Sequence, residues 1–188
     1  MAGFTEKAIK ESFMKLLAEQ PLAKISVKSI VEDCGINRNS FYYHFQDIPS
    51  LIEQIIREAS DALIAKYPSI TSVDECFTAA LTFTLQNKKA VLHIYNSVNR
   101  DIYEKYLMES CDYIVSTYIK TAFGENEISE SDRKMVVKFL KYGLFGASIE
   151  WVEEGMPDNI MDDIHKLLRV CRGLSGDIIE RFKIAEGK

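Results

Sequence analysis

Residues 25–45 constrain the fold more than any other part of the chain, because they carry the start and stop signals of two short helices. Ser26 is a favourable N-cap for the first helix, since its hydroxyl can accept a hydrogen bond from a free backbone N–H. Ile25 and Ile30 flank this cap at the spacing of a hydrophobic staple. Gly35 can adopt the left-handed conformation that turns the chain sharply after a helix. The pattern therefore predicts a short, capped helix that stops beside Gly35.

A second helix is predicted directly after this turn. Asn37 can cap it, and Ile36 and Phe41 repeat the staple spacing. Two capped helices joined by a short turn that contains glycine are typical of a helix-turn-helix. An ordinary αα-corner with a polar face carries the same signals, so capping alone leaves both interpretations open.

The second helix has an apolar and a polar face. The side chains expected to face inward are Ile30, Val31, Ile36, Phe41 and Phe45. Those expected to surround the outward face are Arg38, Asn39, Ser40, Tyr42, Tyr43 and His44. Arg and Asn can form paired hydrogen bonds with base edges, and Ser, Tyr and His can reach phosphates. Lys28 and the backbone N–H groups near Ser26 could hold the opposite phosphate wall, so the segment favours binding to double-stranded DNA.

The charge distribution permits DNA binding but does not demand it. The formal net charge is −5 over 188 residues, and lysine plus arginine balance the acidic residues within residues 1–50. The acidic excess therefore lies after residue 50. Residues 34–46 contain Arg38 and His44 and no acidic residue, and a locally non-acidic surface can approach phosphate.

Apolar residues recur at helical spacing nearly everywhere and no segment alternates with period two, which predicts an all-α protein. The first helix is expected after Thr5 and before Pro21, with one apolar face made of Ile9, Phe13, Leu16 and Leu17. About nine helices are expected in total. Those that follow the two helices of residues 25–45 are expected at residues 49–67, 72–85, 91–98, 102–123, 130–154 and 159–182. A polar loop is expected at residues 125–132. A continuous helix from Pro49 could join a small front domain to a larger rear one.

Nothing in the sequence marks an enzyme, a metal site or a membrane protein. The cysteines are far apart and form no CxxC pair, so reduced thiols are favoured over zinc or disulfides; they are Cys34, Cys76, Cys111 and Cys171. The three histidines fall in different predicted helices, and neither a phosphate loop nor a nucleophile elbow is present. We predict no catalytic residue, metal or cofactor. With no apolar run near the about 20 residues that cross a membrane and no signal-peptide core, we expect a cytoplasmic protein.

One stretch links the segment to a known family. Phe41-Tyr-Tyr-His-Phe45, after the lead-in from Ser26 to Ile36, resembles the tetracycline-repressor (TetR) family of bacterial regulators over about residues 5–55. The resemblance implies a three-helix DNA-binding domain at 1–48 and a helical effector-binding and dimerisation domain at 49–188. It implies a DNA-facing set of Asn37, Arg38, Asn39, Ser40, Tyr42, Tyr43 and His44. Family members usually carry lysine at the start of the fourth helix, where this chain has Ile48, so one phosphate contact is expected to be missing or replaced.

A second stretch, residues 142–157, is similar to the C-terminal domain of a Firmicutes-type subgroup of these regulators. Gly143, Gly146 and Ala147 share one helical face that would let another helix approach closely, and Trp151 lies a turn further on. The resemblance implies a homodimer whose last two helices pair with those of the partner. The alternative is that both glycines serve packing within one subunit.

The middle helices are rich in aromatic residues, which could line an apolar pocket for a small hydrophobic or aromatic effector. The candidate effector-binding residues are Phe83, Tyr95, Tyr103, Tyr106, Tyr142, Phe145 and Trp151. An aromatic stripe at helical spacing is also typical of a plain core. The resemblance to the TetR family implies a transcriptional regulator, with repression as the preferred role, that binds a palindromic operator as an effector-responsive dimer. The alternatives are an enzyme, and a helical interaction module or regulator-like protein without DNA binding.

Overall fold

The computed structural model describes residues 2–67, 73–123, 129–171 and 181, and within them the chain is helical without a strand. The predicted all-α class is confirmed. None of the described helices has the length and apolar character needed to cross a membrane. The elements are α1 (Ala2–Glu19), a 3₁₀ turn η1 (Leu22–Lys24), α2 (Val27–Cys34), α3 (Arg38–His44), α4 (Ile48–Lys66), α5 (Val73–Gln86), α6 (Lys88–Tyr95), α7 (Arg100–Phe123), α8 (Glu130–Glu153) and α9 (Ile160–Cys171).

The first and last helices differ from their predicted bounds. α1 begins at Ala2, so Thr5 lies inside the helix and does not start it. α9 is described to Cys171. Its predicted continuation toward Phe182 falls mostly on residues 172–180, which lie outside the described part of the chain.

The short helix expected at residues 91–98 is shifted toward the N-terminus and occupies Lys88–Tyr95. Ser97 explains the early end. Its hydroxyl donates to the carbonyl of Ile94 at 2.6 Å and accepts from the N–H of Asn99 at 3.0 Å. Such local side-chain bonds compete with the helical ladder, so the chain leaves the helix before Ser97.

Packing divides the chain into two units. Unit 1 comprises Met1–Asp61 and Gln86–Tyr106, and unit 2 comprises Ala62–Leu85 and Leu107–Lys188. Each unit is therefore built from two separate stretches of sequence. In the prediction from sequence, DNA binding belongs to residues 1–48 and effector binding with dimerisation to residues 49–188. This assignment concerns function, which packing does not test, so it stays a prediction.

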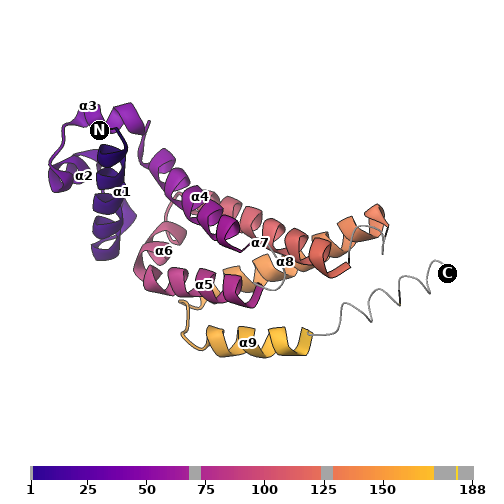
Figure 1. Cartoon of the computed structure of the whole chain (residues 1–188). Helices are drawn as coiled ribbons and strands as arrows, with labels where there is room; N and C mark the ends of the chain where they lie inside the picture. The colour runs from indigo at the N-terminus through magenta and orange to yellow at the C-terminus, as the bar shows by residue number, and fades with distance from the viewer. Residues whose placement is uncertain (1, 68–72, 124–128, 172–180, 182–188) are drawn as a thin grey trace. The chain divides into compact units, whose positions relative to one another are not determined.

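The core of unit 1 is centred on α1, which packs against α2, α3 and α6 (Figure 1). Ile9, Phe13 and Leu17 lie on one face of α1 and are fully buried, while Leu16 is half-buried. The predicted apolar face of the first helix is thus confirmed. Each fully buried side chain of this kind contributes about 1.5–3 kcal/mol to folding.

Two polar side chains tie α1 to its neighbours inside unit 1. The buried Ser12 hydroxyl donates to the carbonyl of Ile30 in α2 at 3.2 Å. Nδ1 of His93 in α6 lies 2.7 Å from the carbonyl oxygen of Leu17. Because a carbonyl only accepts, Nδ1 must carry the proton in this bond. α6 is therefore joined to the C-terminal end of α1 by a hydrogen bond as well as by apolar packing.

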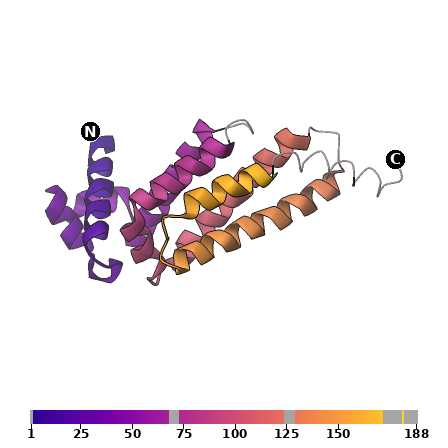
Figure 2. The same cartoon turned by 90° about the horizontal axis from the view of Figure 1, so that it is seen from below.

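Unit 2 contains α7 from Leu107 onward and the long helix α8, and these two helices lie side by side (Figure 2). Val115 and Ile119 of α7 are buried, and Val136, Val137 and Leu144 of α8 pack against them. A salt bridge from Lys141 to Asp112, 2.5 Å long, adds a polar link between the same helices.

The turn after α8 is anchored by Trp151. Its ring is 7% exposed and its Nε1 donates to the carbonyl of Pro157 at 3.0 Å. Gly155 has φ 81° and Met156 has φ 58°, so two successive residues are in the left-handed region. Met156 is fully buried, which offsets the cost of this conformation for a non-glycine residue.

Cys111 offers a simple test of the packing of α7. The thiol is 3% exposed, and burial raises its pKa to about 12. At pH 8 roughly one molecule in ten thousand then carries the reactive thiolate. We expect iodoacetamide to modify Cys111 only after unfolding, as followed by peptide mass spectrometry, with the half-buried Cys34 as the internal comparison. Modification of native protein at the rate seen in denaturant would contradict this packing.

Candidate nucleic-acid interface

The N-terminus of α2 is capped as predicted. Ser26 is extended, and its Oγ accepts the N–H of Ser29 at 3.1 Å, while the Ser29 hydroxyl accepts the N–H of Ser26 at 3.0 Å. This is a reciprocal capping box with serine in the place usually held by Glu or Gln. Ile25 and Ile30, the predicted staple pair, are both buried. Local sequence therefore sets where α2 begins.

The turn and the second cap are also confirmed. Gly35 has φ 70° and ψ 29°, the left-handed geometry, and its N–H bonds to the carbonyl of Val31. Oδ1 of Asn37 then accepts the N–H of Ser40 at 2.9 Å. Because α2 ends at Cys34 and α3 begins at Arg38, a three-residue turn separates them. The structure thus contains the predicted helix-turn-helix.

α3 buries its apolar residues and exposes most of its predicted DNA face. Phe41 is fully buried and Phe45 is 2% exposed, while Ile30, Val31 and Ile36 also belong to or pack against the same core. The exposed residues are Asn37, Arg38, Asn39, Tyr42 and Tyr43, with Ser40 half-buried. Tyr43 is 80% exposed. Donors of the kind that read bases and bind phosphates are therefore exposed along one short helix and at its N-cap.

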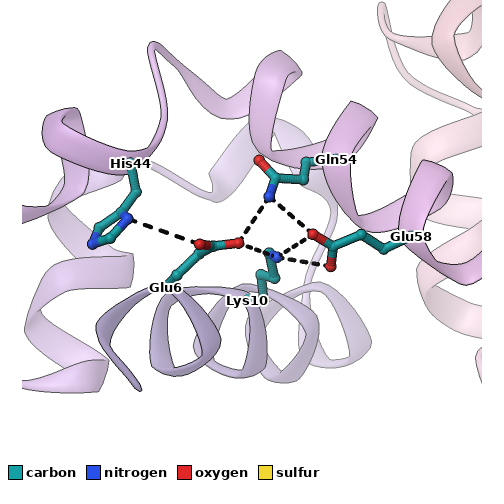
Figure 3. Close-up of polar contacts among 5 residues, drawn as sticks. All are labelled: Glu6, Lys10, His44, Gln54 and Glu58. Atoms are coloured by element: carbon teal, nitrogen blue, oxygen red, sulfur yellow. Dashed lines mark hydrogen bonds and ion pairs between the residues drawn. The ribbon is translucent and has the colours of Figure 1, made fainter. Parts of the chain in front are cut away.

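His44 is the exception to the predicted outward face. Its side chain is 10% exposed, and Nδ1 lies 4.0 Å from a carboxylate oxygen of Glu6 in α1 (Figure 3). Its ring also meets that of Tyr43 edge-on, with centroids 5.1 Å apart. Helical periodicity predicts an outward His44 because it considers α3 alone, whereas Glu6 of α1 lies beside this position at the end of α3.

Lys28 is available at the start of α2. Its side chain is 70% exposed and its ammonium lies 3.7 Å from Glu32, four residues later. An exposed pair of this kind contributes little to stability, so a phosphate could compete for the ammonium. Ser26 is exposed beside it.

Ile48 stands at the first position of α4, where the resemblance implies a lysine. It is half-buried and packs against the core of unit 1. Asp47 caps the helix instead, because its Oδ1 accepts the N–H of Ser50 at 2.8 Å and the Ser50 hydroxyl accepts the N–H of Asp47 at 3.1 Å. The start of α4 therefore carries an acidic cap and an apolar core contact.

The predicted effector-binding residues are divided between the two units. Tyr95, Tyr103 and Tyr106 belong to unit 1, and Phe83, Tyr142, Phe145 and Trp151 belong to unit 2. Tyr95 and Tyr103 are in edge-to-face contact with centroids 5.9 Å apart. The Tyr106 hydroxyl donates to Glu53 at 2.5 Å, which together with burial raises the pKa of the phenol. All three tyrosines of unit 1 thus have structural partners, and the effector site stays a prediction.

A surface groove of unit 2 was not foreseen. It has a volume of about 760 Å³ and lies between α7 and α8, and of the predicted effector residues it includes Tyr142. Its charged lining residues are Asp112, Lys120, Glu130, Arg133, Lys134, Lys138 and Lys141. Among the residues with described positions, no group of three His, Cys, Asp or Glu side chains could hold a metal ion.

The geometry is that of a helical protein in which the second helix of a capped helix-turn-helix exposes a polar face, as in helix-turn-helix DNA-binding proteins. Residues 11–55 match the family described as bacterial regulatory proteins, tetR family, and residues 71–173 match the one described as transcriptional regulator C-terminal region. The chain belongs to the TetR family of transcriptional regulators. These proteins are DNA-binding regulators, not enzymes.

Two curated relatives and one solved structure extend the comparison. The repressor KstR2 of Mycolicibacterium smegmatis is 23% identical over 155 residues, which cover 82% of this chain and 69% of KstR2. The uncharacterized regulator YxbF of Bacillus subtilis is 27% identical over 94 residues, half of this chain but 23% of YxbF. The dihydroxyacetone kinase operon activator DhaS has a TM-score of 0.73 at 18% identity and covers 95% of this chain and 97% of its own. The likeness to DhaS shows a shared fold.

Proposed function

We propose that the protein is a repressor that binds a near-palindromic operator as a homodimer and responds to a small apolar or aromatic effector. The observation that carries the proposal is the exposed polar face of α3 on a firmly capped helix-turn-helix. In a symmetric dimer, the helix-turn-helix domains of the two subunits, which we call the heads, would occupy successive major grooves. Repression is favoured because KstR2, whose match covers 82% of this chain, is a repressor. Operator binding would place the protein in the cytoplasm.

The exposed residues of α2 and α3 would divide the work of binding. Arg38 and Asn39 stand in the first turn of α3, where side chains meet base edges. The proposed phosphate contacts are Ser26, Lys28, Asn37, Ser40, Tyr42 and Tyr43. His44 would position α3 against α1, because α1 covers its side chain. With Ile48 at the start of α4, each head would bind modestly and the dimer would be needed for useful affinity.

Dimerisation would use α8 together with α9. In the described part of the chain, a Cβ built on Gly143 or Gly146 has no neighbour within 4 Å apart from the adjacent residues and the nearby backbone of α8 itself. This open space supports the use of α8 in a dimer, and packing of these glycines within one subunit stays the alternative. Met135, Phe139 and Tyr142 on the same helix are 55%, 79% and 53% exposed. An apolar stripe with small residues at one end suits the close approach of a second copy's helix.

The effector would act through α4. This helix starts in unit 1 and its residues from Ala62 belong to unit 2, so it is common to the head and the rear part of the chain. An effector changes operator affinity only through its different affinity for the two head separations. The seven aromatic residues named above remain its proposed contacts, and 1–48 and 49–188 the proposed DNA-binding and effector domains.

Arg38→Ala is expected to weaken operator binding about 5- to 150-fold, the loss typical of one paired base contact. Lys28→Ala should weaken binding to all sequences and lower the salt slope by about one. The affinity and the salt slope of both variants are measured by gel-shift titrations at several salt concentrations, with the DNA upstream of the chain's own gene.

Lys134→Ala is the matched control for Lys28. Its side chain is 74% exposed and pairs with Glu130 four residues away, as Lys28 pairs with Glu32. It lies in α8, so its loss should leave the salt slope unchanged. Absence of a specific, salt-sensitive complex, or an Arg38→Ala protein that binds like the wild type, would contradict the repressor proposal.

A further inference from the structure

Five polar residues from three helices of unit 1 form one connected cluster (Figure 3). We call it the Lys10 network. It contains Glu6 and Lys10 of α1, His44 of α3, and Gln54 and Glu58 of α4. Its members on α1 and α4 are 48 residues apart in sequence.

Lys10 is the centre of this network. Its side chain is 17% exposed, and its Nζ donates to Glu6 at 2.5 Å and to both carboxylate oxygens of Glu58 at 2.7 Å. Burial opposes its charged form, but the hydrogen bonds and charges of Glu58 and Glu6 raise the pKa of Lys10 above its ordinary value. The ammonium is therefore a permanent charge that bridges α1 and α4.

Gln54 holds the same two carboxylates a second time. Its Nε2 donates to Glu6 at 2.8 Å and to Glu58 at 2.9 Å. Two negative charges from different helices thus share one ammonium and one amide. Without the ammonium, only an uncharged amide would remain between them, and their repulsion would favour separation of α4 from α1.

Glu6 extends the network to the recognition helix. One of its carboxylate oxygens faces Lys10 and Gln54, and the other lies 4.0 Å from Nδ1 of His44 at the end of α3. The same carboxylate is therefore next to both the recognition helix and the bridge to α4.

The position of the network along α4 distinguishes it from the apolar core. Among the residues of α4 whose burial is described, Leu51 and Ile52 are fully buried, and both lie in its first turn and a half. Gln54 and Glu58 follow further along the helix, where α4 has partly buried contacts with the core. Apolar packing is non-directional, whereas short hydrogen bonds to a charged group restrict angle as well as distance. The network is placed to fix the direction in which α4 leaves the head.

We propose that Lys10 is a positioning residue for operator binding, which sets the angle between α4 and the recognition helix and thereby the half-site spacing that the dimer accepts. The inference rests on the proposed dimeric operator binding. A role in stability alone would change the folded fraction and affect all DNA equally. A role in positioning changes which spacings are bound.

The test uses the full-length protein and the operator found upstream of its own gene, with the half-site spacer shortened or lengthened by one and two base pairs. Binding is measured by fluorescence anisotropy at fixed salt, and folding by thermal unfolding. For Lys10→Met we expect the preference for the natural spacer over the altered ones to fall about fivefold or more, the lower end of typical coupling between sites. Affinity for a single half-site duplex should stay unchanged.

Lys15→Met is the matched control. Lys15 is on the same helix and forms an ion pair of similar length, 2.6 Å to Asp33, but this pair joins α1 to α2 instead of α4. Its spacer profile should match that of the wild type. A broadened profile for Lys15→Met would overturn the proposal, because any loss of charge on α1 would then suffice.

The triple variant Lys10→Met, Glu6→Gln, Glu58→Gln keeps the test decisive if Lys10→Met fails to fold. It removes the like-charge repulsion together with the bridge, so it should fold and still show the broadened profile. A wild-type profile in any folded protein without Lys10 overturns the inference while the proposed function stands. A wild-type protein that binds no operator overturns both.

Discussion

Phe41→Ala is expected to destabilise unit 1 by about 3–5 kcal/mol, the usual cost of removing a buried phenylalanine side chain, and to abolish operator binding. Phe41 is fully buried in the core of unit 1, and its ring meets those of Tyr42 and Phe45 at centroid distances of 5.5 and 5.8 Å. It is also the staple partner of Ile36. A domain is stable by only about 5–15 kcal/mol in total, so the loss removes a large part of the margin. Urea unfolding followed by circular dichroism measures it.

Tyr43→Ala separates stability from binding. Tyr43 is two residues further along α3 and 80% exposed, so its removal should change the free energy of unfolding by less than about 0.5 kcal/mol. It should nevertheless weaken operator binding through the lost phosphate contact. Equal stability losses in the two variants, or a Phe41→Ala protein as stable as the wild type, would contradict the division of α3 into a core face and a DNA face.

Gly146→Leu is expected to convert the dimer to a monomer and to weaken operator binding about 100-fold or more, because the linkage of two heads is typically worth 10²–10⁴ in affinity. A leucine on the proposed interface would hold the partner's helix away from α8. The monomer itself should not suffer, since the added Cβ has no described neighbour within 4 Å apart from the adjacent residues and the nearby backbone of α8. Replacing a glycine inside a helix should even stabilise it by about 0.5–1 kcal/mol. Sedimentation equilibrium should therefore show a lower molecular mass than for the wild type, while thermal unfolding should show a higher midpoint temperature.

Lys134→Leu is the control for this variant. It adds the same side chain to the same helix, but twelve residues earlier, which at 100° per residue is about 120° around α8. Lys134 lines the groove beside α7 and is 74% exposed. This variant should remain dimeric. A Gly146→Leu protein that still sediments as the wild-type dimer would place the interface elsewhere.

The helix-turn-helix was predictable because its determinants are local. The side chains of Ser26 and Asn37 each accept the backbone N–H of the residue three positions later. The turn between the helices depends on the left-handed conformation of one residue, Gly35. Such interactions depend only on neighbouring residues, so their pattern can be recognised in the sequence. The same holds for Ser129, whose side chain accepts the N–H of Asp132 and starts α8 where the prediction placed it.

The environment of His44 and the Lys10 network were not predictable in this way. The pairs Glu6 with Lys10 and Gln54 with Glu58 stand at the helical spacing of four and are visible in the sequence. Nothing local shows that α1 and α4 bring the two pairs together, because the link spans 48 residues. Side chains at the ends of short helices depend on which neighbour covers them, and the sequence alone does not specify that neighbour.

The aromatic residues show a further limit of composition. Tyr106 donates to Glu53, and Tyr95 stacks edge-on with Tyr103 and lies under the guanidinium of Arg100 at 4.1 Å. Each contact crosses between helices or turns, so counting aromatic side chains could not separate those that meet neighbouring residues from those left for a ligand. Partners must be known before a pocket can be assigned.

The discontinuous build of unit 1 affects how such a regulator can be re-engineered. Residues 86–106 complete the unit that residues 1–61 begin, with Ala90 and Ile94 in its core and His93 bonded to Leu17. Unit 1, which contains the helix-turn-helix, is therefore not a single contiguous segment that can be transferred to another protein with one junction. A chimera joined at residue 61 would press one protein's α1 against another protein's α6 and lose the fitted surface between them. Specificity should transfer more readily by grafting the exposed side chains of α3 than by transplanting a contiguous head.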